Sequence, residues 1–152
     1  MAPRLHVAIA VDAVACATLS ACGDAPPEPV AATPSQYVAG AEALLDPPAQ
    51  LASLVSERSA DPGAAIPPRD QLDAIVERAR ARLAAFRALR LPDRRLRGQR
   101  DRLAAAYERL TALMPATVDA LADRDRGALA TAASPFLAAL RGLSSVTASP
   151  SP

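Results

Sequence analysis

The apolar side chains of residues 69–90 recur at the spacing of an α-helix. They lie three or four positions apart and leave polar residues between them; the apolar set is Leu72, Ile75, Val76, Ala79, Leu83, Phe86 and Leu89. Aspartates near the start of this stretch and arginines near its end suit the dipole of a helix. The pattern therefore predicts an amphipathic helix from about residue 69 to 90.

Two further helices come after short connections. The first reaches about residue 123 and presents Leu96, Leu103, Ala106, Tyr107, Leu110, Leu113, Val118 and Leu121. The second runs from about residue 128 to 143 and presents Leu129, Ala132, Ala133, Phe136, Leu137 and Leu140. Pro115 and Pro135 each lack a backbone donor, so a kink or a new segment is expected at both.

The first helix is predicted to begin with Thr33 as its N-cap and Pro34 at the first helical position. Its apolar residues are Tyr37, Ala41, Leu44 and Leu45. The run Asp46-Pro47-Pro48 predicts a break or a kink, after which Asp46 is expected to cap a second segment that ends near residue 58. A Pro-rich loop over residues 59–68 leads to the next helix.

These elements predict an all-α fold, an antiparallel bundle of about four helices with proline kinks over residues 35–143. Alanine is abundant and favours helix, whereas β-branched residues are too few and too scattered for a sheet. The small polar residues 144–152 predict a disordered tail.

The chain before the bundle has the order of an export signal. Arg4 precedes an apolar run over residues 7–19, which is too short to span a bilayer as a helix. Small residues then lead to a cysteine in the run Leu19, Ser20, Ala21, Cys22. This run resembles the lipobox of bacterial lipoproteins. The resemblance implies a signal peptide over residues 1–21, which is removed, and a diacylglyceryl group and an added acyl chain on Cys22.

The resemblance also implies a lipid anchor on the extracytoplasmic side of the cell membrane or the outer membrane. Residues 22–34 would then be the lipidated cysteine and a Pro-rich tether. Two alternatives stay open, because Asp12 interrupts the apolar run and Arg4 is the only arginine before it. They are an ordinary secretory signal and a cytosolic protein with a misplaced start codon. A lipobox ending at Cys16 would leave too short an apolar run.

The residues after Cys22 carry little catalytic chemistry. They contain no His, Lys or further Cys, so the usual base of a nucleophilic triad and the usual zinc ligands are missing. Three carboxylates cluster at Asp119, Asp123 and Asp125. They predict a calcium-binding loop, without its third acidic ligand and its late glutamate, or an acid–base pair, or a solvated helix end with capping aspartates. We expect no enzyme, cofactor or metal.

Charge is distributed unevenly along the chain. Residues 23–68 hold six acidic residues and one Arg, whereas residues 69–102 hold eleven Arg and five acidic residues. The basic segment is densest at Arg94, Arg95, Arg97, Arg100 and Arg102, which we call the arginine block. It predicts either a face for anionic lipid or an acidic partner, or a solvated face balanced by the acidic first helix. Nucleic acid is not expected, because no aromatic residues interleave to stack on bases.

The sequence thus predicts a membrane-anchored lipoprotein whose helical body has an interaction or structural role, with a possible protein partner in the cell envelope. The alternative is a bundle that binds a small apolar ligand. Four aromatic residues could line such a pocket or could belong to the core; they are Tyr37, Phe86, Tyr107 and Phe136.

Overall fold

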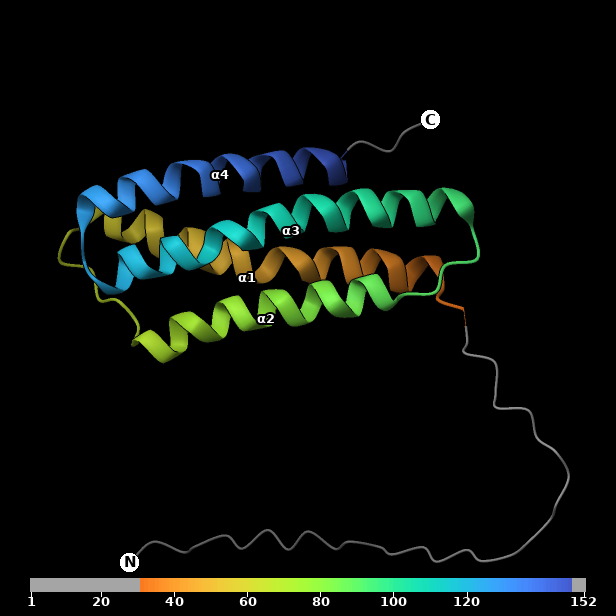
Figure 1. Ribbon diagram of the computed structural model, residues 1–152, viewed down its shortest axis with the longest axis horizontal. Helices are drawn as coiled ribbons and strands as arrows, with labels where there is room; N and C mark the ends of the chain where they lie inside the picture. Colours follow the sequence, from red (N-terminus) through yellow and green to blue (C-terminus); the bar gives the residue numbers. More distant parts are fainter. Residues whose placement is uncertain (1–30, 149–152) are drawn as a thin grey trace, which may run out of the picture.

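Residues 31–148 form a bundle of four α-helices joined by short connections (Figure 1). The structure is a computed structural model that describes the backbone of these residues and their side chains as far as Leu143. The helices are α1 (Pro34–Ala60), α2 (Arg69–Ala88), α3 (Arg94–Ala122) and α4 (Arg126–Ala148). Consecutive helices run in opposite directions. The described residues contain no strand, so the predicted all-α bundle is confirmed.

Helix α3 is the central element of the bundle. It packs extensively on α2 and on α4 and also contacts α1. Helix α1 packs closely on α2 but only sparsely on α4, and α2 and α4 do not contact each other within the described residues. The α1–α4 seam is therefore the least closed of the seams between neighbouring helices.

The core is aliphatic with three buried aromatic rings. Phe86, Tyr107 and Phe136 are the largest side chains with almost no exposed surface. Around them lie the residues that the helical spacing selects; in α2 all six predicted positions from Leu72 to Phe86 are buried. Tyr37 of α1 is half-buried, and its ring centroid lies 5.6 Å from that of Phe86. The aromatic residues thus fill the spaces between helices that leucine and alanine leave.

Helix α1 is continuous through its two prolines, and the separate segment that Asp46 was expected to cap does not form. Pro47 cannot donate to the carbonyl of Ala43, which would lie unpaired in a partly buried position. Arg82 of α2 supplies the missing donor, because its Nη1 bonds the Ala43 carbonyl oxygen. The same Nη1 lies 2.6 Å from Oδ2 of Asp46. Asp46 therefore holds Arg82 in place.

Pro115 and Pro135 also lie inside continuous helices. In α3 the residues Leu110, Met114, Val118 and Leu121 are buried on both sides of Pro115. Their spacing keeps them on one face only if the helix continues, so packing offsets the cost of the missing backbone bond.

The last helix is longer than the sequence predicts, since it ends at Ala148 and not near residue 143. Extending a formed helix fixes one residue for each new hydrogen bond, and no proline occurs between Pro135 and Pro150. Residues 149–152, the rest of the predicted tail, lie outside the described residues.

The helix starts agree with their capping residues. Thr33 accepts from the Gln36 amide, and the Gln36 side chain accepts from the Thr33 amide, so the predicted N-cap is confirmed as a capping box. Asp93 caps α3 through the Leu96 amide. Just before α1, the Ala32 amide donates to the Arg90 carbonyl oxygen over 2.7 Å. The chain therefore enters the bundle beside the α2–α3 connection.

The bond between Arg82 and the Ala43 carbonyl predicts a coupling between Arg82 and Pro47. Arg82→Met keeps the aliphatic stem and removes the donor, which should cost about 1–2 kcal/mol in urea unfolding. With Pro47→Ala, the new amide can bond the Ala43 carbonyl, so the same Arg82 change should cost less, by at least about 0.5 kcal/mol.

Arg80→Met is the matched control on α2, since Arg80 forms an ion pair with Glu77 of the same helix on the exposed surface. It should change stability by no more than about 0.5 kcal/mol in either background. Equal costs of Arg82→Met with and without Pro47 would contradict the assignment of Arg82 to the freed carbonyl.

The hydroxyl of Tyr107 is buried without a hydrogen-bond partner among the described residues. Burial raises the pKa of Tyr107 above its ordinary value. The folded chain therefore keeps a proton that the unfolded chain releases near pH 10, and stability should fall as pH rises above about 10. Tyr107→Phe should be neutral or stabilising by up to about 1 kcal/mol at neutral pH and should reduce the alkaline loss. Urea unfolding of the wild-type and Tyr107→Phe proteins, at neutral pH and above about pH 10, measures both effects. If the free energy of unfolding falls equally with pH in the two proteins, the loss does not come from the buried Tyr107 hydroxyl.

Candidate functional site

The predicted lipidation site lies outside the described residues. This applies to Leu19, Ser20, Ala21 and Cys22, to the signal peptide over residues 1–21 and to most of the tether. Within the described residues, the last part of the tether is held by Ala32 and Thr33 against the start of the bundle. The lipobox therefore stays a prediction from sequence.

The arginine block lies at the end of the bundle where α2 connects to α3. Arg97 donates to the carbonyl oxygens of Leu91 and Pro92 over 2.9 Å and 2.6 Å. Arg100 donates to the Leu89 carbonyl over 2.6 Å and forms an ion pair with Asp101. These two arginines satisfy the carbonyls that the helix end and the connection leave open. They stabilise the connection.

Arg94, Arg95, Arg97 and Arg102 are exposed, and Arg100 is half-buried. The balancing of basic α2 by acidic α1 is limited to one ion pair among the described residues, between Arg82 and Asp46. Other pairs from α2 reach α3 instead: Arg69 contacts Asp119, and Arg87 contacts Glu108 over 2.6 Å. The hydrogen bond from Arg87 lowers the pKa of Glu108. Several arginines of the basic segment thus bond within the fold, and most of the arginine block is exposed at one end of the bundle.

The three clustered aspartates do not converge on a common point. Asp119 pairs with Arg69, and Asp125 accepts from the amides of Gly127 and Ala128 at the start of α4. Among residues 31–148, no group of three or more acidic, His or Cys side chains is placed to hold a metal ion. Asp125 acts as a helix cap, as the interpretation of the cluster as a solvated helix end predicts.

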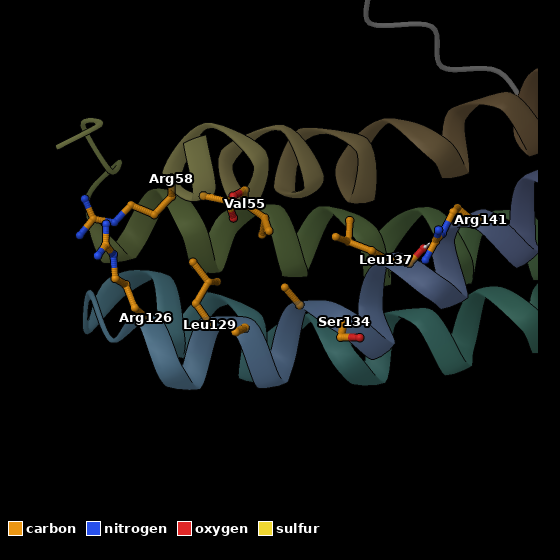
Figure 2. A pocket seen from close by; sticks show the side chains of 10 residues that line it. Val55, Arg58, Arg126, Leu129, Ser134, Leu137 and Arg141 are labelled. Carbon is orange, nitrogen blue, oxygen red and sulfur yellow. Dashed lines mark hydrogen bonds between the residues drawn. The ribbon is translucent and has the colours of Figure 1, made fainter. Parts of the chain in front are cut away.

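The aromatic residues proposed for a ligand pocket belong to the core. Phe86, Tyr107 and Phe136 are each at most 2% exposed. The structure has a groove at a different place, away from these aromatic residues. It has a volume of about 460 Å³ and lies on the α1–α4 seam (Figure 2). We call it the α1–α4 groove, and its lining residues are Val55, Arg58, Ser59, Arg126, Leu129, Ala130, Ala133, Ser134, Leu137 and Arg141.

The α1–α4 groove combines an apolar floor with a cationic rim. Val55, Leu129 and Ala133 are buried at its floor, and Leu137 is half-buried beside them. Ala130, Ala133 and Ser134 on the α4 side are small and leave space that larger side chains would fill. Figure 2 shows the side chains of Arg58 and Arg126 pointing toward one another at one end of the groove, with Arg141 toward the other.

The two converging arginines have no acidic partner among the described residues, and no acidic residue lines the groove. Arg58 lies in the last turn of α1, where a cation suits the helix dipole. Arg126 is the first residue of α4, where a cation is disfavoured. Helix stability therefore explains Arg58 but not the placement of Arg126 beside it.

Sequence reasoning missed this groove because its charged residues are far apart in the chain. Arg58 lies in α1, Arg126 and Arg141 lie at the two ends of the groove on α4, and none of the three belongs to the arginine block. Only the adjacency of the first and last helices brings them together. The small residues of α4 are the one feature of the sequence that is compatible with a groove. A stripe of alanines is equally typical of closely packed helices, so it does not predict a groove.

No protein-family model, curated protein or solved structure matches this chain. Within residues 31–148, none of the helices combines the length and the apolar character that crossing a membrane requires.

The different positions of the block arginines predict different effects on stability. Arg97→Gln and Arg100→Gln should each cost about 1–2 kcal/mol, because the shorter side chain leaves the carbonyls of the α2–α3 connection unpaired. Arg94→Gln removes the same charge from an exposed position and should cost no more than about 0.5 kcal/mol. Urea unfolding of the three variants checks this, and equal costs for all three would contradict the structural role of Arg97 and Arg100.

Proposed function

We propose that this protein is a bacterial lipoprotein, anchored by lipid on Cys22 at the outer side of the cell membrane or the outer membrane. The observation that carries the proposal is the order of residues 1–22. Arg4 comes first, the apolar run is next, and the run Leu19-Ser20-Ala21 then precedes the cysteine. The helical bundle is its extracytoplasmic body.

The position of the chain entry supports this arrangement. The Ala32 amide bonds the Arg90 carbonyl, so the tether joins the bundle at the end that carries the arginine block. Residues 23–31 lie between Cys22 and this point, and a Pro-rich spacer of that length reaches about 28 Å. The exposed residues Arg94, Arg95 and Arg102 would then lie at the membrane-proximal end, where anionic headgroups attract cations.

We infer an interaction or structural role for the bundle, without catalysis. The residues after Cys22 lack His and Lys, and several of the described acidic residues, among them Asp46, Glu108, Asp119 and Asp125, form ion pairs or helix caps. A protein partner in the cell envelope fits this role. Ligand binding is the second candidate function, and the α1–α4 groove is the observation that favours it.

The lipid anchor predicts a specific dependence on Cys22. In a bacterial host, the Cys22→Ala protein should stay unprocessed and without lipid, because the modified thiol is what lipoprotein processing requires. Cys16→Ala is the matched control and should leave processing intact. Mass spectrometry of the mature N-terminus measures both. An unmodified N-terminus at any residue after Cys22 in the wild-type protein would contradict the proposal and indicate ordinary secretion.

A further inference from the structure

The α1–α4 groove has the features of a ligand site that the lipoprotein proposal does not use. Its volume of about 460 Å³ lies within the range of small-molecule pockets, which is roughly 300–1,000 Å³. Its charged groups lie at the ends, and its floor is aliphatic. This separation of charge from apolar surface indicates an amphiphilic ligand.

The charge of the groove determines whether the head group of that ligand is anionic or cationic. Three arginines line the groove and no acidic residue does. Arg58 and Arg126 approach each other although like charges repel, and Arg126 lies at the end of α4 where a cation is disfavoured. A bound anion would remove both penalties, because a guanidinium pair can donate several hydrogen bonds to one carboxylate or phosphate.

The floor indicates an apolar chain attached to the anionic head. Figure 2 shows Val55, Leu129 and Leu137 between the arginine pair and Arg141, and Ala133 lies one helical turn after Leu129 on α4. From Arg126 to Leu137 the α4 backbone rises about 16 Å, which gives room for an extended alkyl chain. Arg141 closes the far end, and its Nε donates to the Leu137 carbonyl over 3.3 Å.

We propose that the α1–α4 groove binds a single-chain anionic amphiphile, with its carboxylate or phosphate between Arg58 and Arg126 and its alkyl chain on the apolar floor. The ligand class covers free fatty acids and anionic lysophospholipids, which share this chemistry. The inference does not depend on the lipid anchor, since it uses only residues of α1 and α4.

The test is titration of the full chain with dodecanoate below its micelle concentration, monitored by amide chemical shifts in NMR spectra. Shifts should concentrate at Val55, Leu129, Ala130 and Ala133. Dodecanol and dodecyltrimethylammonium, which keep the chain but lack the anion, should bind at least about tenfold more weakly. A parallel titration with lysophosphatidylglycerol distinguishes a phospholipid ligand from a free fatty acid. Tighter binding of it than of dodecanoate indicates a phospholipid, and the reverse indicates a fatty acid.

Matched variants separate the groove from the rest of the surface. Arg58→Gln and Arg126→Gln should each weaken dodecanoate binding about tenfold or more. Arg124→Gln removes a neighbouring exposed charge outside the groove and should leave binding unchanged. Ala130→Phe should block the groove from an exposed position, whereas Ala128→Phe, on the same helix but outside the groove, should not.

Stability without the amphiphile gives an independent readout. If Arg58 and Arg126 serve a ligand, Arg126→Gln should leave the unfolding midpoint unchanged or raise it, because it relieves the repulsion and removes a cation from the start of α4. Arg58→Gln should change the midpoint only slightly, because the lost attraction to the α1 dipole opposes the relief of repulsion. Loss of stability in both variants would assign them a structural role and overturn the proposal. So would equal binding of dodecanol, or dodecanoate shifts that spread over the bundle and ignore the Arg58 and Arg126 changes.

Discussion

The fold depends on the bond from Arg82 to the Ala43 carbonyl, because this bond keeps α1 in one piece across Pro47 and Pro48. Two adjacent prolines would ordinarily end a helix, since each removes a backbone donor and crowds the carbonyl four residues before it. Here a guanidinium from α2 takes the place of one lost amide, and Asp46 holds it there. Leu44 and Val55, on opposite sides of the prolines, are then both buried in the same core.

The continuity of α1 also creates the α1–α4 groove. The C-terminal half of α1 carries Val55, Arg58 and Ser59 to α4, where the facing side chains include the small residues Ala130, Ala133 and Ser134. The α3–α4 contact is extensive, so α4 is held from one side and its other side closes only partly on α1. The least packed seam of the bundle is thus the one where arginines gather without an acidic residue in the lining.

Helical spacing was sufficient to predict the elements and most of the core. All six predicted positions in α2 are buried, and Thr33 and Pro34 begin α1 as their local chemistry requires. The continuity at Pro47 could not be predicted, because the donor that replaces the missing amide comes from a residue 39 positions away from Ala43. The sequence also shows the arginine block only as a run of charge. Whether a given arginine bonds a carbonyl, as Arg97 and Arg100 do, depends on where the α2–α3 connection turns.

Amide hydrogen exchange across the prolines tests the central claim most directly. If α1 is one helix held by Arg82, the amides of residues 49–57 should exchange as slowly as those of residues 40–45. In the Arg82→Met variant, protection should fall around residues 44–52 before it falls in α3. Rapid exchange of residues 49–57 in the wild-type protein, with protection confined to residues 36–45, would show that α1 ends at the prolines and would contradict this account.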